Sequence, residues 1–232
     1  MKTIGLIGGM SWESTLTYYQ IINRTIGERL GGLHSAKCLI YSLDFQEIEE
    51  CQTSGDWERS GDVLAAAALG LERAGAEFIL ICSNTMHKVA GRVQSEIGVP
   101  LVHIADPTIS ELRKRGVERV GLLGTKYTMT QDFYVDKLKQ AGIEVMIPEG
   151  EDIDIVNSVI YGELCLGKIS EKAKEDYLRI VGDMAARGAQ GVILGCTEIG
   201  LLIGQDDTTV PLFDTTYIHA NHAALASIGL AT

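Results

Sequence analysis

The chain has 232 residues, of which 46% are hydrophobic and 22% charged, as in ordinary globular proteins with one large domain or two smaller ones. Its formal net charge of −11 argues against a nucleic-acid partner and against docking on anionic membranes, because both need a basic face. The N-terminal segment lacks the apolar core and cleavage site of a signal peptide. No uncharged apolar run approaches the ~18 residues of a membrane-spanning helix. We therefore expect neither nucleic acid nor a membrane as a partner.

Short β-branched or leucine-rich segments alternate with amphipathic segments along the chain. The predicted strands are Thr3–Ile7, Cys38–Ser42, Phe78–Cys82, Leu101–Ile104, Arg119–Leu123, Glu144–Pro148, Val192–Leu194 and Pro211–Phe213. The predicted helices are Ser14–Leu30, Ser60–Ala74, Thr108–Arg115, Thr130–Ala141 and Glu171–Ala186, with a C-terminal helix from about Tyr217. Continuous apolar strands separated by helices predict an α/β protein with doubly wound, mainly parallel sheets that are covered on both faces.

Three segments of the first half recur in the same order in the second half. They are residues 74–85 and 187–198 at an offset of 113, Ile4–Gly8 and Val120–Gly124 at 116, and Pro100-Leu101 and Pro211-Leu212 at 111. Strands of α/β proteins resemble one another in general, but agreement at three places favours a duplication. We therefore expect two similar α/β domains related by a pseudo-twofold axis. The first would comprise residues 1–105 and 217–232, and the second residues 106–216.

The repeat also predicts where a ligand binds. Ligands of open α/β sheets bind outside the carboxyl ends of the strands. At the offset of 113, Ser83 corresponds to Cys196 and Asn84 corresponds to Thr197. We therefore expect an active site in the cleft between the two domains, with Ser83 and Cys196 on opposite sides of a small substrate.

The cysteines differ in their expected roles. The chain has five, at an odd count and without a CxxC pair, so we expect reduced thiols and a cytoplasmic location rather than a disulfide framework. No metal-ligand spacing is present, so no metal is expected. Cys196 follows an apolar strand and precedes small polar residues, a turn in which backbone amides should lower the thiol pKa and produce a base or nucleophile. A buried core position is the alternative for Cys196, and it is the favoured interpretation for Cys82, whose side chain should point away from that of Ser83.

Three motifs carry a resemblance to a known family. Gly8-Gly9-Met10, Ser83-Asn84-Thr85-Met86-His87 and Gly195-Cys196-Thr197-Glu198 resemble the corresponding motifs of the aspartate/glutamate racemase family, and the resemblance extends over nearly the whole chain. It implies cofactor-independent racemisation of amino acids, with neither pyridoxal phosphate nor a metal, in a two-domain protein that forms a homodimer. It also implies that two cysteines, one per domain, work on opposite faces of the substrate Cα, one removing the α-proton and the other returning a proton.

The resemblance and the expected cleft together assign the site residues. Cys196 is the expected main acid/base and Ser83 lies opposite it. Substrate contacts are expected from Met10, Asn84, Thr85, Tyr127, Thr197 and Glu198. Asn84, Thr85 and Thr197 carry groups that suit the carboxylate of an amino acid, although the same groups also cap helices.

The sequence departs from the family pattern at two places. Where the family usually has Cys-Asn-Thr, this chain has Ser83, and serine holds negligible alkoxide unless it is activated. The segments Leu43–Ile48 and Gly162–Gly167, where aspartate-directed members would carry basic residues, contain no lysine or arginine. A racemase of broader amino-acid range therefore stays open. So do a decarboxylase of malonate-like acids that uses one cysteine as proton donor, and a catalytically degraded amino-acid-binding protein.

Overall fold

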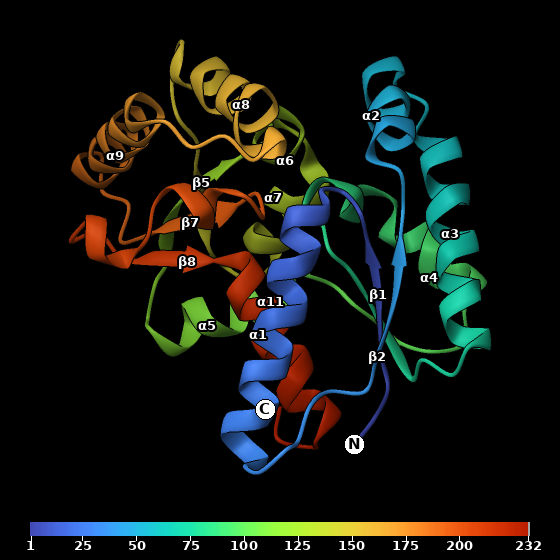
Figure 1. Cartoon of the computed structure of the whole chain (residues 1–232). Coiled ribbons are helices and arrows are strands. Elements are labelled where there is room, and N and C mark those ends of the chain that lie inside the picture. Colours follow the sequence, from blue (N-terminus) through green and yellow to red (C-terminus); the bar gives the residue numbers. More distant parts are fainter. Residues whose placement is uncertain (232) are drawn as a thin grey trace. The chain divides into compact units, whose positions relative to one another are not determined.

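The computed structural model describes residues 1–231, which form two compact α/β units (Figure 1). One unit consists of Met1–Ile104 together with the chain from His219 onward, and the other is Ala105–Ile218. The first unit therefore contains segments from both ends of the sequence. Within residues 1–231, no helix has the length and apolar character needed to cross a membrane.

The first unit is built on a four-stranded parallel sheet. Its strands are β1 (Ile4–Gly8), β2 (Cys38–Ser42), β3 (Phe78–Ile81) and β4 (Leu101–Val102), in the order β2-β1-β3-β4. Its helices are α1 (Trp12–Leu30), α2 (Phe45–Ser54), α3 (Trp57–Arg73), the 3-10 helix η1 (Thr85–Val89), α4 (Ala90–Glu96) and most of α11 (Thr215–Ser227). The two faces of the sheet carry separate cores, one packed against α1 and α11 and the other against α2, α3 and α4 (Figure 1).

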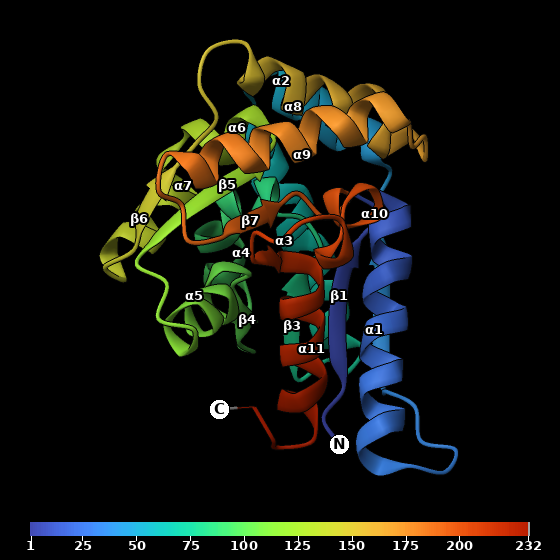
Figure 2. The same ribbon diagram turned by 90° about the vertical axis from the view of Figure 1, so that its left-hand side faces the viewer.

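The second unit repeats this arrangement. Its strands are β5 (Arg119–Gly124), β6 (Glu144–Met146), β7 (Val192–Gly195) and β8 (Leu212–Asp214), all parallel, in the order β6-β5-β7-β8. Its helices are α5 (Ala105–Lys114), α6 (Lys126–Thr130), α7 (Asp132–Gln140), α8 (Asp152–Gly162), η2 (Leu164–Leu166), α9 (Glu171–Ala186), α10 (Ile199–Leu202) and η3 (Gln205–Asp207). Helices α8 and α9 cover one face of the sheet (Figure 2).

The strand register shows that the sequence repeat is a structural repeat. Ile7 of β1 pairs with Ile81 of β3, and Leu123 of β5 pairs with Leu194 of β7, at the sequence offsets of 116 and 113. The strand order is the same in both sheets. The prediction of two similar parallel α/β sheets is confirmed, and Ser83 and Cys196 occupy equivalent positions after β3 and β7.

Several helices were not predicted. Helices α2, α4 and α8 fall in segments with no expected element, and the expected helix Thr130–Ala141 corresponds to α7, which is preceded by the separate short helix α6. The two helices are separated at Gln131, whose backbone is extended (φ −103°, ψ 151°). Helix α8 is rich in Ile and Val, which favour strands, but Val156 and Ile160 are buried against α9 and this packing outweighs the local preference.

A fully buried histidine joins α11 to the sheet of the first unit. His219 Nε2 lies 2.9 Å from the carbonyl oxygen of Val102, so this nitrogen carries a proton and donates it. His219 Nδ1 lies 2.8 Å from the Tyr18 hydroxyl, which is on α1. Burial lowers the pKa of His219 well below its usual value, and the nearby His87 and His222 act in the same direction. The imidazole is therefore neutral, and Nδ1 accepts the hydrogen bond from Tyr18.

Replacing His219 should change the pH dependence of stability. Below the ordinary histidine pKa of about 6.5 the unfolded chain binds a proton that the folded chain excludes, so the free energy of unfolding should fall as the pH falls. His219→Gln should flatten this decline between about pH 8 and pH 5, while costing about 1–3 kcal/mol at pH 8 through its lost hydrogen bonds. Urea unfolding at a series of pH values measures both effects. His34→Gln, which alters an exposed histidine, is the control. Parallel pH curves for His219→Gln and wild type would contradict the prediction.

Candidate active site

The expected site residues lie in two buried loops, one in each unit. Ser83, Asn84 and Thr85 follow β3 after the single residue Cys82 and are buried. Cys196, Thr197 and Glu198 directly follow β7 and are buried as well. In both units these loops begin at the carboxyl end of a central strand, which is the edge of a parallel sheet where ligands bind.

The first loop turns directly into the 3-10 helix η1. The Ser83 hydroxyl oxygen accepts a hydrogen bond from the Met86 N–H at 3.4 Å, which closes the first turn. The Ser83 carbonyl oxygen lies 2.7 Å from His87 Nδ1. The serine is 8% exposed, so its hydroxyl lies at the edge of the protein interior. The loop is therefore held through both the side chain and the backbone of Ser83.

The neighbouring Cys82 belongs to the core. Its side chain is fully buried with those of Leu80 and Phe78, on the sheet face that packs against α1 and α11. Burial raises the pKa of its thiol far above the usual range. The expectation from strand alternation, that Cys82 points away from the Ser83 side chain and into the core, agrees with this placement.

The second loop holds a thiol against a carboxylate. Cys196 Sγ lies 2.9 Å from Glu198 Oε2, and the Thr197 hydroxyl donates to the same oxygen at 2.9 Å. Cys196 is 8% exposed and Glu198 only 2%. Because an ionised carboxylate only accepts hydrogen bonds, the Cys196 thiol is the donor. The three residues therefore form one hydrogen-bonded group with Glu198 at its centre.

This geometry corrects the expected pKa of Cys196. The turn was expected to lower the thiol pKa, but burial raises it well above the usual value. The Glu198 charge, the neighbouring Cys165 and the thiol's hydrogen bond to Glu198 raise it further, and only a backbone interaction with Glu198 acts in the opposite direction. Cys196 therefore rests as a protonated thiol. The sequence predicts the turn, but it does not reveal that the Glu198 side chain accepts a hydrogen bond from the Cys196 sulfur.

The two remaining expected residues, Met10 and Tyr127, lie outside the Ser83 and Cys196 loops. Met10 is buried in the hydrophobic core of the first unit, in the cluster that contains Ile7 and Ile81. Tyr127 is half-buried in α6. Their proposed role as substrate contacts remains a prediction.

The sequence analysis did not identify the residues at the start of α11 whose side chains hold the Cys196 loop in place. The Thr215 hydroxyl donates to the Leu194 carbonyl at 2.7 Å, and the Thr216 hydroxyl donates to the Thr197 carbonyl at 3.3 Å. Asp214 precedes both and accepts the Thr216 N–H at 2.8 Å, at the start of α11. An acidic residue followed by two threonines is a helix-start signal, which could have identified this segment.

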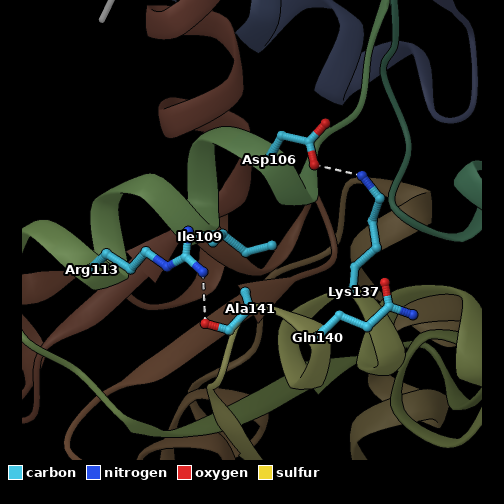
Figure 3. Close-up of a pocket in the computed structure, with 6 residues that line it drawn as sticks. All are labelled: Asp106, Ile109, Arg113, Lys137, Gln140 and Ala141. Atoms are coloured by element: carbon cyan, nitrogen blue, oxygen red, sulfur yellow. Dashed lines mark hydrogen bonds and ion pairs between the residues drawn. The ribbon is translucent and has the colours of Figure 1, made fainter.

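Two pockets lie within single units and neither contains these loops. A pocket of about 400 Å³ between α5 and α7 is lined by Asp106, Ile109, Arg113, Lys137, Gln140 and Ala141 (Figure 3). Both cations there are occupied, since Lys137 pairs with Asp106 and Arg113 donates to the Ala141 carbonyl at 2.8 Å. The second pocket, of about 210 Å³, is lined by Trp12, Thr15, Leu16, Tyr19, Ile40 and Ser42. Among residues 1–231, no cluster of three or more His, Cys, Asp or Glu side chains is arranged to hold a metal ion.

Comparisons with known proteins agree with the fold and the motifs. The Asp/Glu/Hydantoin racemase family model matches residues 7–223. A broad specificity amino-acid racemase of Bacillus subtilis is 25% identical over 92% of each chain. Among solved structures, a candidate Asp/Glu racemase from Yersinia pestis is 52% identical with a TM-score of 0.91, covering 98% of this chain and 100% of the other. An aspartate racemase homologue from Pyrococcus horikoshii is 42% identical with a TM-score of 0.85, at the same coverage.

Removing the Glu198 charge should make Cys196 more reactive. The carboxylate raises the thiol pKa both by its charge and by its hydrogen bond, so Glu198→Gln should increase the thiolate fraction. Iodoacetamide should then alkylate Cys196 faster at a fixed pH, as followed by mass spectrometry of the Cys196 peptide. Glu144→Gln removes an equal charge from an exposed position of the same unit and should leave the rate unchanged. Equal rates in the two variants would show that Glu198 does not control the thiol.

Proposed function

Because the chain belongs to the Asp/Glu/Hydantoin racemase family, we propose that it racemises amino acids without a cofactor, with Cys196 as the main acid/base and Ser83 on the opposite face of the substrate. The observation that carries this proposal is the buried hydrogen bond between the Cys196 thiol and the Glu198 carboxylate, 2.9 Å long, at the carboxyl end of a parallel strand. A thiol paired with a carboxylate can both give and receive a proton.

Glu198 raises the pKa of the resting Cys196 thiol, but it is also the group placed to accept the thiol proton once the ammonium group of a bound amino acid favours the thiolate. The resting thiol first passes its proton from Sγ to Glu198 Oε2, along the existing hydrogen bond. The thiolate then takes the α-proton of the substrate and becomes a thiol again, while the electron pair of the C–H bond stays on Cα. Glu198 thus holds one proton until solvent removes it. Thr197 donates to the same carboxylate oxygen and keeps it oriented toward the sulfur.

Ser83 has a different task from Cys196. A serine hydroxyl is too weak an acid to be left as an alkoxide, so we assign it a relay: as its proton moves to the opposite face of Cα, the hydroxyl takes a proton from a bound water. The hydroxide so formed is neutralised by the proton that Glu198 releases to solvent. Asn84 and Thr85 lie next to it and supply polar groups for the substrate carboxylate. Hydrogen bonds to that carboxylate stabilise the carbanion-like state, which in a cofactor-free site must come from such oriented groups. The Thr197 hydroxyl is committed to Glu198 and contributes less here.

We propose a substrate range of the aspartate/glutamate type that extends to other amino acids. The absence of lysine and arginine from Leu43–Ile48 and Gly162–Gly167 supports the broader range. So does the match to a relative described as a broad specificity amino-acid racemase. The aspartate racemase homologue among the solved structures supports the acidic substrates.

One observation favours a second candidate. A single protonated thiol, which is what Cys196 is at rest, is also the group that a cofactor-free decarboxylase of malonate-like acids needs to protonate its carbanion product. The two reactions differ in their products, since decarboxylation releases CO₂ and racemisation does not.

The proposed reaction should appear as proton exchange in D₂O. Incubation with each enantiomer of aspartate, glutamate and several neutral amino acids should replace the α-proton by deuterium and invert the configuration. Cys196→Ala should slow both by at least about a hundredfold, the usual scale for losing a general base. Proton NMR and chiral chromatography follow the two events. Cys38→Ala, at a half-buried cysteine of β2, is the matched control. CO₂ release from a malonate without α-proton exchange would instead establish the decarboxylase.

Substitutions at Ser83 should separate exchange from inversion. Ser83→Ala removes the proton donor of one face, so the enantiomer whose α-proton faces Cys196 should still exchange while inversion falls by at least about tenfold. Ser83→Cys supplies a far better acid and base and should speed inversion above the wild-type rate. Measuring both rates in one D₂O experiment avoids differences in protein concentration. If Ser83→Ala inverts as fast as wild type, Ser83 has no role in proton delivery.

A further inference from the structure

The strongest unassigned feature is a buried histidine that holds the Ser83 loop from behind. His87 lies in η1 and is 3% exposed. Its Nδ1 lies 2.7 Å from the Ser83 carbonyl oxygen, and its Nε2 lies 3.0 Å from the backbone nitrogen of Ile104. Ile104 is the last residue of the first unit before the chain enters the second. One side chain therefore connects the Ser83 loop to the end of the segment that follows β4.

The two partners fix the protonation of the ring. The Ile104 N–H can only donate, so Nε2 is an acceptor without a proton. The Ser83 carbonyl can only accept, so Nδ1 carries the proton. His87 is therefore a neutral imidazole in the Nδ1–H form. With both nitrogens committed to the backbone, it has no free position for exchanging a proton with a substrate.

Two further imidazoles pack around His87. Its ring centroid lies 4.4 Å from that of His103 and 6.0 Å from that of His219, the latter in an edge-on arrangement. His219 is itself anchored by Tyr18 and by the Val102 carbonyl. The ring of His87 is thus packed against His103 and against His219, which is fixed to α1 and β4. The position of the His87 ring is therefore fixed by contacts that lead back to the sheet.

We propose that His87 is a positioning residue for Ser83: its Nδ1–H holds the Ser83 carbonyl and thereby sets the direction of the Ser83 hydroxyl. The Ser83 hydroxyl oxygen also accepts the Met86 N–H, so the carbonyl and the hydroxyl are fixed by the same turn of η1. Loss of the Nδ1–H contact frees the peptide unit that orients the hydroxyl. The proton step on the Ser83 face should suffer, whereas the step on the Cys196 face should not. The inference rests on the proposed racemase function for its kinetic consequences only.

Two substitutions test the two hydrogen bonds of His87 separately, because each retains one and removes the other. In His87→Asn the side-chain amide nitrogen takes the place of Nδ1 and retains a donor toward Ser83. In His87→Gln the side-chain oxygen takes the place of Nε2 and retains an acceptor toward Ile104. If the Ser83 contact is what matters, His87→Asn should keep most of the inversion rate and His87→Gln should lose about tenfold or more, as His87→Ala does. If His87 only stabilised the fold, the inversion rates of His87→Asn and His87→Gln would not follow this order.

The deciding measurement compares inversion with α-proton exchange in D₂O for the wild type and these variants. Inversion should fall in His87→Gln and His87→Ala, and exchange of the enantiomer that faces Cys196 should stay within about twofold of wild type. His34→Gln, at an exposed histidine of the same unit, should change neither rate. Equal loss of exchange and inversion, or no loss of either, would overturn the proposal.

A second readout does not depend on turnover. Nitrogen NMR of the His87 side chain should show a protonated Nδ1 and an unprotonated Nε2. Amide hydrogen exchange should quicken at Met86 in His87→Gln but remain slow in His87→Asn. If the wild type turns over none of the tested amino acids, the proposed function fails while these two measurements still decide the role of His87. A ring protonated on Nε2, or Met86 protection unchanged in all variants, would refute it.

Discussion

The register between the two central strands of each sheet is the constraint on which the rest of the structure depends. In the second unit, a Cβ added to Gly124 would lie 2.8 Å from the Gly195 carbonyl oxygen, and one added to Gly195 would lie 2.8 Å from that of Leu123. Backbone atoms cannot yield as a flexible side chain can, so these two positions require glycine. At these two glycines the backbones of β5 and β7 approach each other closely, and both strands end at the same edge of the sheet. The loop after β7 begins there, with Cys196 as its first residue. The same pairing of β1 with β3 places Ser83 at the equivalent point.

The two loops start at equivalent points of their sheets, but they contain groups with different acid/base properties. The loop after β7 holds one proton between a thiol and a carboxylate 2.9 Å apart, both buried, so the proton can move between two acidic groups. The loop after β3 contains a hydroxyl and a neutral histidine whose nitrogens are both committed to the backbone. Nothing in that hydrogen-bonded arrangement stores a negative charge. We therefore propose that similar scaffolds support an acid/base centre in one unit and an orienting centre in the other.

The sequence predicted the strands better than the helices, for a physical reason. All eight strands fall within or beside expected segments, because buried parallel strands are short apolar runs bounded by glycine or polar turns. Helix α8 was not predicted because its Ile and Val residues are helical only through tertiary contacts. One of these contacts is the hydrogen bond from the Tyr177 hydroxyl to the Val156 carbonyl. At the site, the motifs located Ser83 and Cys196. The direction of the Cys196 pKa shift was wrong because it depends on burial and on the Glu198 side chain, neither of which a local pattern reveals.

The placement of the charges explains how such a site can work in a strongly acidic protein. Burying Glu198 costs free energy unless the carboxylate receives hydrogen bonds, and the Cys196 thiol and the Thr197 hydroxyl donate two, both to Oε2. Burial disfavours a charged Cys196, and a thiolate would also add a second negative charge next to that of Glu198, so the sulfur stays protonated at rest. An ammonium group on an incoming amino acid would reverse that balance, since a positive charge near the sulfur favours the thiolate. The substrate would then help to create the base that removes its own α-proton, and the thiol would remain unreactive until an amino acid is bound.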